Sequence, residues 1–267
     1  MSVLRAEIDG QPATVEQLLT TTTVNYGHFT GMTAVDGRVR GLDLHLARLG
    51  AATSALFGTT LDLDRVRALL RQALSGLSGP VSARINVFPA ALTWDGLGAP
   101  IEPRVLVLIR PAPEPVTTPL RTRTARYSRD APEFKHVGTF GLFQQQRLAR
   151  LDGYQDVVFL DERGRLSEGS IWNLGLFDGE HVVWPAAAVL PGIAYQLLRR
   201  GLAELGVPEL DRPVEPAQLP GFRAAFFTNA PTGARALSSI DEVEFAVDAE
   251  LMDLLRRAYE LAPWDEV

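Results

Sequence analysis

Lys135 is the only lysine in this chain of 267 residues. The other 25 of the 26 lysine and arginine residues are arginines. Arginine replaces lysine wherever only positive charge is needed, but its pKa above about 12 prevents it from acting as a neutral amine near pH 7. A primary amine is required for Schiff-base formation with a carbonyl group. Two interpretations stay open on the count alone. Either Lys135 is kept for amine chemistry, or an arginine-rich composition left one surface lysine by chance.

Two short polar patterns have the residue types to bind a small substrate. Tyr26, His28 and Thr30 alternate along the chain, and so do Arg84 and Asn86. Each set therefore lies on one face if its segment is a strand. The Arg84 guanidinium has the fork geometry to bind a carboxylate through two parallel hydrogen bonds. For each of these five residues, the alternative is an ordinary half-exposed strand position.

Composition excludes several classes of protein. The net charge of −6 disfavours non-specific nucleic-acid binding, and the absence of cysteine excludes disulfides, thiolate metal sites and cysteine nucleophiles. The cysteine-free sequence fits a reducing cytoplasm, where we expect this protein to act. The four histidines show no metal-ligand spacing, and no apolar run reaches the ~18 residues of a membrane span. We therefore expect no metal site, no nucleic-acid partner and no membrane insertion.

The elements that must position these residues begin with a mixture of strands and helices. The dipeptide Asp36-Gly37 is a strong hairpin turn signal, and leucines at helical spacing followed by Gly58 indicate a helix that ends there. The expected elements are a hairpin over 24–39, helices over 42–57 and 62–77, and strands over 81–88 and 104–109.

A proline-rich segment at 111–119 divides the sequence. It holds four prolines, which remove backbone donors and favour extended chain. We predict a linker here between an N-terminal lobe, 1–110, and a C-terminal lobe, 120–267; the alternative is a proline-rich edge strand within one domain. Lys135 then lies in a loop after a strand at 120–127. The other expected elements are helices at 139–151, 192–205 and 250–261 and strands at 154–160, 171–177, 181–184 and 224–228, which makes the class α+β.

The order of motifs in the second lobe resembles the class IV aminotransferases, the type IV fold of pyridoxal 5'-phosphate (PLP) enzymes. The motifs are FKHVGTFGLFQQQRLARL, LSEGSIWN, VLPGIAYQLL and FFTNAPTG, and LHLARLGAAT in the first lobe resembles the same family. The family includes branched-chain and D-amino-acid aminotransferases and aminodeoxychorismate lyase. The resemblance spans nearly the whole chain. It implies a two-lobed fold, with a small N-terminal α/β lobe and a larger C-terminal lobe of mostly antiparallel sheet.

The resemblance also implies a role for individual residues. Lys135 would be the Schiff-base lysine, and Glu168, 33 residues later, the carboxylate that keeps the pyridine nitrogen of PLP protonated. Arg48 would bind the cofactor phosphate. The other cofactor contacts that it implies are Asn173, Leu190, Gly192, Ile193, Ala194, Thr228, Asn229 and Ala230. Tyr26, His28 and Thr30 fall where the family lines its substrate pocket, and Arg84 and Asn86 are the other two candidate substrate residues.

Three departures from the family pattern bear on the reaction. Ala194 stands where many members have threonine, which removes one hydroxyl contact to the phosphate. Asn229-Ala230 resembles the lyase version of the second phosphate loop. Phe140 stands five residues after Lys135, where the aminotransferases have a tyrosine that donates a hydrogen bond to the 3' oxygen of the cofactor. The lyases also lack this tyrosine.

Three functions therefore stay open. The first is an aminotransferase that moves an amino group from an amino donor to a 2-oxo acid through a Lys135 Schiff base. The second is a PLP-dependent lyase of the aminodeoxychorismate type that releases pyruvate. The third is a binding or scaffold protein that has lost PLP. The resemblance further implies a homodimer whose sites lie at the lobe interface and are completed by the partner chain.

Overall fold

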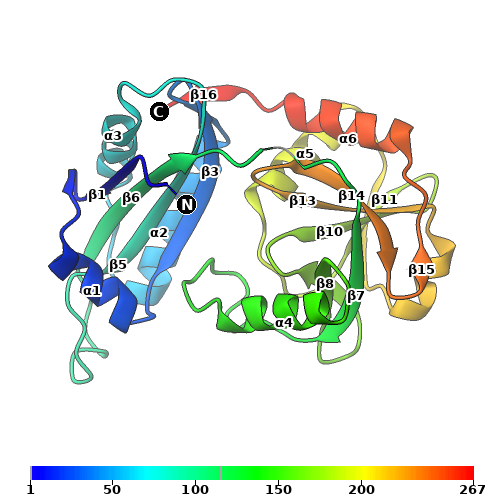
Figure 1. Ribbon diagram of the computed structural model, residues 1–267, viewed down its shortest axis with the longest axis horizontal. Coiled ribbons are helices and arrows are strands. Elements are labelled where there is room, and N and C mark those ends of the chain that lie inside the picture. The colour runs from blue at the N-terminus through cyan, green and yellow to red at the C-terminus, as the bar shows by residue number, and fades with distance from the viewer. Residues whose placement is uncertain (1, 115) are drawn as a thin grey trace. The chain divides into compact units, whose positions relative to one another are not determined.

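The computed structural model describes residues 2–114 and 116–267, which form two compact units (Figure 1). The first unit contains residues 2–114, Phe134–Gly138 and Pro263–Val267; the second contains 116–133 and Thr139–Ala262. The division falls inside the predicted linker 111–119, of which residue 115 lies outside the described residues. The prediction that 120–267 forms one lobe differs from the structure at two places, because two short later segments pair with strands of the first unit.

The first unit is built on a seven-stranded sheet in which every pairing between described strands is antiparallel. The β3–β4 hairpin turns at Asp36 and Gly37, with φ of 49° and 74°, as the sequence predicts. The strand itself begins later than predicted, at His28. The strand order is β16 (Trp264–Glu266), β4 (Arg38–Arg40), β3 (His28–Val35), β5 (Pro80–Pro89), β6 (Pro103–Pro111), β1 (Arg5–Ile8) and β2 (Gln11–Pro12).

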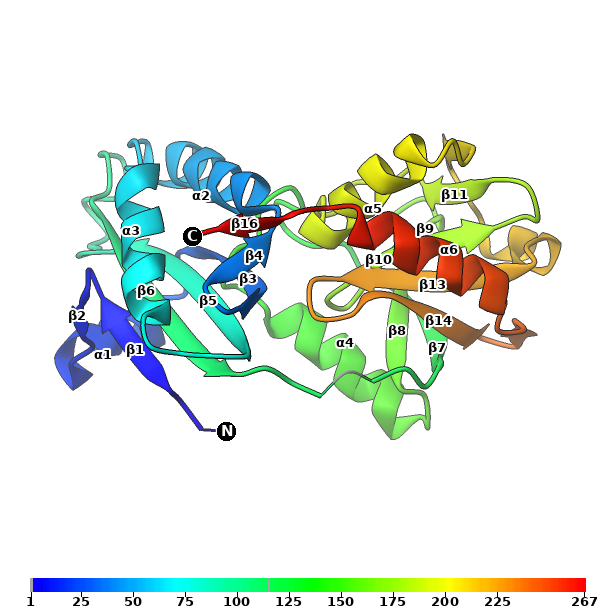
Figure 2. The ribbon, with the colours of Figure 1, turned by 90° about the horizontal axis from the view of Figure 1, so that it is seen from above.

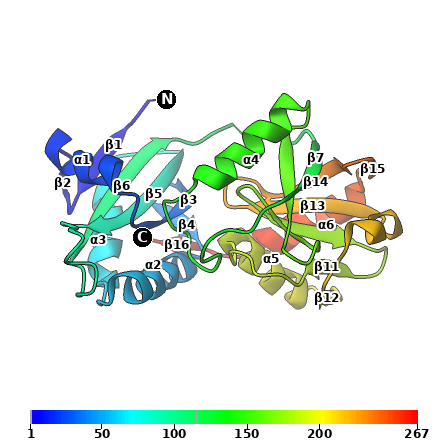
Figure 3. The same ribbon diagram turned by 90° about the horizontal axis from the view of Figure 1, so that it is seen from below.

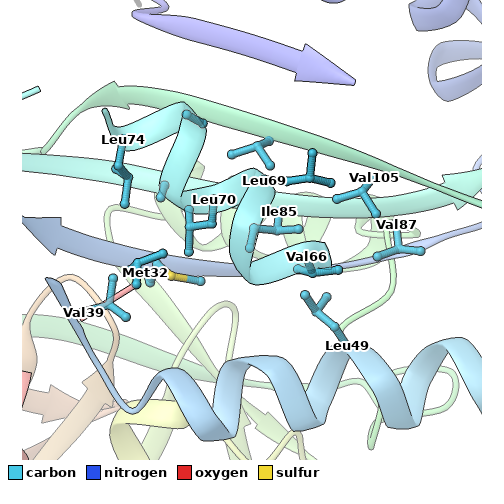
Figure 4. Close-up of a cluster of buried hydrophobic side chains, with 14 of the residues drawn as sticks. Met32, Val39, Leu49, Val66, Leu69, Leu70, Leu74, Ile85, Val87 and Val105 are labelled. Carbon is cyan, nitrogen blue, oxygen red and sulfur yellow. The ribbon is translucent and has the colours of Figure 1, made fainter. Parts of the chain in front are cut away.

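Helices α2 (Leu42–Phe57) and α3 (Leu63–Leu74) cover one face of this sheet, and α1 (Val15–Thr23) precedes β3 (Figure 2). Helix α2 has the predicted bounds and ends at Gly58, whose φ of 64° is readily adopted by glycine. Helix α3 begins at the cap Asp62, whose carboxylate accepts the Arg65 N–H, and it ends three residues before the predicted end. Side chains from both helices and from the strands fill the core between them (Figure 4).

The C-terminal strand β16 closes one edge of the first sheet. It pairs with β4, and the Asp265 carboxylate accepts the N–H of Leu42 at the start of α2. The Arg71 guanidinium donates to the Val267 carbonyl at 2.6 Å, and the Val267 side chain joins the buried core. These contacts explain why residues 263–267 belong to the first unit.

The second unit is built on a nine-stranded sheet in which antiparallel pairings predominate, with parallel pairing of β7 to β8, β7 to β14 and β11 to β12. The predicted hairpin around Asp178-Gly179 is present as β10 and β11. The strands are β7 (Leu120–Arg126), β8 (Asp156–Leu160), β9 (Leu166–Gly169), β10 (Asn173–Phe177), β11 (Val182–Pro185), β12 (Glu209–Arg212), β13 (Ala224–Asn229), β14 (Gly233–Ile240) and β15 (Val243–Glu244).

Three helices pack on this second sheet. Helix α4 (Phe140–Leu151) lies against β7 and β8 (Figure 3), and α5 (Ile193–Glu204) and α6 (Ala249–Glu260) pack against each other and against β14 (Figure 2). A buried cluster that includes Trp184, Leu198, Phe226 and Leu255 fills the space between α5, α6 and the sheet. A short 3₁₀ helix spans Pro216–Gly221. Within the part of the chain that the structure describes, no helix is long and apolar enough to cross a membrane.

Candidate active site

Lys135 is positioned by backbone pairing with the first unit's sheet. Its carbonyl accepts the Phe29 N–H at 2.9 Å, and the Val137 N–H donates to the Gly27 carbonyl at 2.9 Å. His136 thereby forms an isolated antiparallel bridge with His28, at the beginning of β3. The loop predicted around Lys135 is thus attached to the start of β3 by these two hydrogen bonds. The Lys135 side chain extends from this attached segment.

The ring of Phe29 connects Lys135 with two of the predicted substrate residues. Nζ of Lys135 lies 5.0 Å from the ring centroid, and the guanidinium carbon of Arg84 lies 3.6 Å from it. Arg84 donates from Nε to the Asn86 side-chain oxygen at 2.7 Å, which fixes the guanidinium on this face. Phe29 is opposite Asn86 in the β3–β5 register, so these side chains share one half-exposed face of the sheet. Sequence reasoning missed Phe29, because an aromatic residue in a strand gives no chemical signal.

His28 and Thr30 lie on the opposite, helix-covered face of the same strand. Nε2 of His28 is 2.9 Å from the Thr53 hydroxyl, and the Thr30 hydroxyl is 2.6 Å from Nδ1 of His45. Tyr26 precedes the strand, stacks on Phe57 of α2 and donates its hydroxyl to the Leu56 carbonyl. The structure thus separates the five predicted substrate residues, with Arg84 and Asn86 near Lys135 and the other three packed against α2.

The two buried histidines are neutral. Burial lowers the pKa of His28 to about 4. Burial lowers the pKa of His45 to about 3, and the positive charges of Arg48 and Lys135 add to the effect. Arg48, on the same helix and half-exposed, is therefore close enough to His45 to act on it electrostatically, as is Lys135. Burial and the neighbouring Arg110 lower the pKa of Arg84, which remains a cation at neutral pH.

In the second unit, sheet register brings Glu168, Asn173 and Thr228 into one row. Asn173 of β10 pairs with Glu168 of β9 on one side and with Thr228 of β13 on the other. Directly paired residues in antiparallel strands have side chains on the same face. The row is buried, since Glu168 is 5%, Asn173 6% and Thr228 1% exposed. Glu168 and Thr228, 60 positions apart in sequence, thus lie on either side of Asn173 in a row across three strands.

This row holds the segment that leads into helix α5. The Glu168 carboxylate accepts the Leu190 N–H at 3.2 Å, and the Asn173 amide donates to the Leu190 carbonyl at 2.7 Å. The Asn173 side-chain oxygen also accepts the Gly192 N–H. A Cβ at position 192 would overlap that oxygen, so only glycine permits this close approach. Leu190 and Gly192 are therefore fixed by the two polar side chains beside them.

The residues at the start of α5 fit a phosphate. Ile193 and Ala194 form the first turn of the helix, and the cap residue Gly192 supplies no side-chain hydrogen bond. Backbone N–H groups and the dipole at such a helix start favour an anion. The Thr228 hydroxyl is a buried group that finds no hydrogen-bond partner among the described residues. A buried hydroxyl without a partner is costly, and because Thr228 pairs with Asn173, which holds the start of α5, its hydroxyl is placed to serve a ligand there. The donor set of this unit therefore suits the phosphate of PLP.

A second polar network supports the row, and sequence reasoning missed it. The buried Asp156 carboxylate accepts the Trp172 indole N–H at 3.0 Å and the Gln146 amide at 3.1 Å, and Gln146 also donates to the Ser170 hydroxyl. This network fixes the turn between Glu168 and Asn173. The signal that could have indicated this network is Asp156, an acidic residue at the start of the otherwise apolar strand DVVFL.

The structure also locates the three departures from the family pattern. Ala194 is buried in the first turn of α5, so this position offers only its backbone N–H. Asn229 ends β13, and its side-chain oxygen accepts the Thr232 N–H, which closes the turn that contains Ala230. Phe140 is the first residue of α4 and its side chain is 81% exposed.

The fold and these donors define a two-unit protein of the PLP fold type IV class. The family model for class IV aminotransferases matches residues 27–240. The chain belongs to this family, whose members are enzymes that use PLP and act on amino acids and 2-oxo acids. No match was found among curated protein sequences.

Solved structures of aminotransferases and of a lyase resemble the chain. A branched-chain aminotransferase from Thermoproteus uzoniensis, solved with norvaline, has a TM-score of 0.86 and 17% identity over 98% of this chain and 95% of that one. A Legionella pneumophila protein with a proposed 4-amino-4-deoxychorismate lyase activity has a TM-score of 0.80 and 19% identity, over 95% and 96%. A PLP-bound aminotransferase from Brucella abortus has the same TM-score and identity, over 91% of both chains. These likenesses confirm the predicted fold.

Proposed function

We propose that this enzyme is an aminotransferase that moves an amino group from an amino acid or amine to a 2-oxo acid, with Lys135 as the residue that binds PLP covalently. The observation that carries the proposal is the buried row of Glu168, Asn173 and Thr228 at the start of α5, because these donors and acceptors suit both ends of PLP. Bound PLP supplies an electrophilic aldehyde and a ring that takes up electrons.

Lys135 has two tasks in this proposal. Its amine would hold the cofactor, and as a free amine it would move the proton between the substrate's Cα and the C4′ carbon of the cofactor. Anchoring of the Lys135 carbonyl to the Phe29 N–H fixes the backbone, and the side chain extends over the Phe29 ring. The single lysine of the sequence is thus used where only an amine suffices.

In the second unit, Glu168 is assigned to the pyridine nitrogen. Its carboxylate is held by the Leu190 N–H and lies beside Asn173, so its orientation is set before the cofactor arrives. A carboxylate in this role keeps the ring nitrogen protonated, which stabilises negative charge at the substrate carbon. The N–H groups of Ile193 and Ala194 and the Thr228 hydroxyl are assigned to the phosphate, with Asn229 and Ala230 in the adjoining turn.

In the first unit, Arg48 is assigned to phosphate binding and Arg84 to a substrate carboxylate. Arg84 is held on the Phe29 face by Asn86, which pre-organises its remaining N–H groups for a planar anion. Neutral His45, three residues before Arg48, adds no positive charge that would repel the Arg48 guanidinium. Tyr26, His28 and Thr30, which contact α2, are then supports of this helix rather than direct substrate contacts.

A PLP-dependent lyase that releases pyruvate is the second candidate. Two observations favour it: Phe140 has no hydroxyl where the aminotransferases have tyrosine, and Asn229-Ala230 matches the lyase version of the phosphate loop. The structural likeness to the Legionella pneumophila protein is consistent with both functions, since at 19% identity it bears on the fold alone.

A half-reaction separates the two candidates. The PLP-loaded protein is incubated, in the absence of any oxo acid, with a panel that contains amino donors of both configurations and 4-amino-4-deoxychorismate. An aminotransferase loses the visible absorbance of bound PLP, forms the pyridoxamine cofactor and releases one 2-oxo product per site. A lyase releases pyruvate over many turnovers and keeps the absorbance. If the panel yields neither result, both proposals fail.

We further propose a cytoplasmic homodimer. The absence of cysteine supports the location. Helix α4 supports the assembly, because Phe140, Phe143 and Leu151 fall near one helical face and are 81%, 59% and 67% exposed. Sedimentation equilibrium of wild type and of Phe143→Ser tests it, and we expect the substitution to weaken the dimer. A monomeric wild type would overturn the proposal.

A further inference from the structure

Phe140, the first residue of helix α4, lacks the hydroxyl that a tyrosine would provide as a hydrogen-bond donor. In related aminotransferases a tyrosine at this position donates to the 3' oxygen of PLP, whereas the Phe140 ring carries no polar atom. Its side chain is 81% exposed. If the enzyme transfers amino groups, another donor near the first turn of α4 must satisfy that oxygen.

Tyr127 places a phenol hydroxyl at the same turn. It directly follows β7, its N–H donates to the Leu160 carbonyl, and its ring packs on Phe159 with centroids 4.8 Å apart. The hydroxyl lies over Gly141, the residue after Phe140, and a Cβ at that position would overlap it. Only glycine at position 141 therefore leaves room for the Tyr127 hydroxyl.

The electrostatic surroundings of Tyr127 keep its hydroxyl protonated. Burial raises its pKa, and the negative charges of Asp130 and Glu168 raise it further, whereas the positive charge of Arg129 opposes them. The hydroxyl is thus a donor at neutral pH, within electrostatic reach of the carboxylate assigned to the pyridine nitrogen. Among the described residues, no group accepts a hydrogen bond from it, so its donor capacity is available to a ligand.

We propose that Tyr127 replaces the tyrosine that Phe140 lacks and donates its hydroxyl to the 3' oxygen of bound PLP. This inference rests on the proposed PLP chemistry and deepens it. Tyr127 would act as a positioning residue that also sets the proton affinity of the bound cofactor. This role would explain why Gly141 follows Phe140, because the Tyr127 hydroxyl occupies the space that a side chain at position 141 would fill.

A pH titration of the bound PLP absorbance tests the proposal. Tyr127→Phe removes the hydroxyl and keeps the ring on Phe159. A hydrogen bond to the 3' oxygen stabilises its negative charge, so losing it should raise the pKa of the bound chromophore by about one pH unit and weaken PLP binding about tenfold. Gly141→Ala should produce the same rise by displacing the hydroxyl. Tyr154→Phe, whose ring lies under Arg121, is the matched control and should titrate like wild type.

Restoring the donor at the family position completes the test. Phe140→Tyr in the Tyr127→Phe background should return the chromophore pKa to the wild-type value. A shift in Tyr127→Phe that Phe140→Tyr does not reverse would show that Tyr127 acts elsewhere and would overturn the replacement. Unchanged titrations in both Tyr127→Phe and Gly141→Ala would also overturn it. A wild type that forms no borohydride-reducible PLP adduct would instead refute the proposed function itself.

Discussion

The two units hold their candidate residues in contrasting ways. Lys135 of the first unit lies outside regular structure, on a segment tied to β3 by two backbone hydrogen bonds, with its amine over an aromatic ring. Glu168, Asn173 and Thr228 of the second unit lie within strands, in one buried row. The difference matches the tasks proposed for them. A nucleophile that must be released and return needs a mobile side chain, whereas charges that stabilise an intermediate act best when fixed in advance.

Lys135→Ala should have the largest effect, because it removes the nucleophile of the first unit. With no other lysine in the chain, we expect no PLP adduct after borohydride reduction and no measurable amino transfer. Mass spectrometry of the reduced protein measures the adduct, and circular dichroism checks the fold. Lys135→Arg is the control for charge, because it keeps the cation and lacks a titrating amine. An adduct in either variant would contradict the assignment.

Glu168→Gln should spare covalent binding and slow the chemistry. Glutamine still accepts the Leu190 N–H, so the row should remain folded, but a neutral amide does not hold the ring nitrogen protonated. We expect kcat to fall by roughly 10²–10³-fold, the usual loss when one pre-organised electrostatic contact is removed. Steady-state kinetics with a fixed donor measures this. Glu162→Gln, at the exposed turn before β9, is the control, and equal rates in both variants would argue against the role of Glu168.

The first unit should respond to acid through its buried histidines. Folded His28 and His45 have pKa values of about 4 and about 3, whereas an unfolded histidine titrates near 6.5. The unfolded state therefore binds more protons between these values, and stability falls as pH drops below 6.5. At pH 5 the loss is about 2 kcal/mol for each histidine.

Urea unfolding at pH 7 and pH 5 measures this loss. His45→Gln should be less sensitive to the change in pH than wild type, because one of the two buried imidazoles is gone. His181→Gln, in the β10–β11 turn, should keep the wild-type sensitivity. If all three proteins lose the same stability between the two pH values, the acid response does not come from His45.

Thr228→Val should have opposite effects on the apoprotein and on cofactor binding. Removing a buried hydroxyl without a partner should stabilise the apoprotein by about 1 kcal/mol, while the loss of a hydrogen bond to phosphate should weaken PLP binding roughly tenfold. Ser239→Ala in β14 is the matched control, since its buried hydroxyl also finds no partner among the described residues. That control should leave PLP affinity unchanged, and a similar loss of affinity in both variants would remove Thr228 from the phosphate site.

Local sequence signals predicted many of the elements, but not α1, β1, β2, β9, β12, β14 or β15, and contacts between distant segments escaped them. Gly58 and the leucine spacing gave the bounds of α2, and Asp36-Gly37 gave the β3–β4 turn, because both signals lie within a few residues of the structure that they specify. The three-residue strand β16 and the bridge at His136 were missed, since each depends on a partner more than 100 residues away.

For the candidate site, too, individual residues could be predicted from the sequence, whereas their arrangement in space could not. The residues alone singled out Lys135, through its rarity, while the family resemblance was needed for Glu168 and Thr228. The row that joins them is a consequence of strand register, which no short motif encodes. Tyr127 escaped both kinds of reasoning, because its proximity to Gly141 arises from the packing of α4 on β7 and β8.

Strand β16 has a consequence for the order in which the protein is made. Residues up to Glu114 leave the ribosome long before Pro263–Val267, yet both belong to one unit. Until Pro263–Val267 emerge, the β4 edge stays unpaired by β16 and the Leu42 N–H lacks the Asp265 carboxylate. Open edges recruit other strands. The nascent first unit, whose strand β3 anchors Lys135, is therefore exposed to misassembly until residues 263–267 have been synthesised.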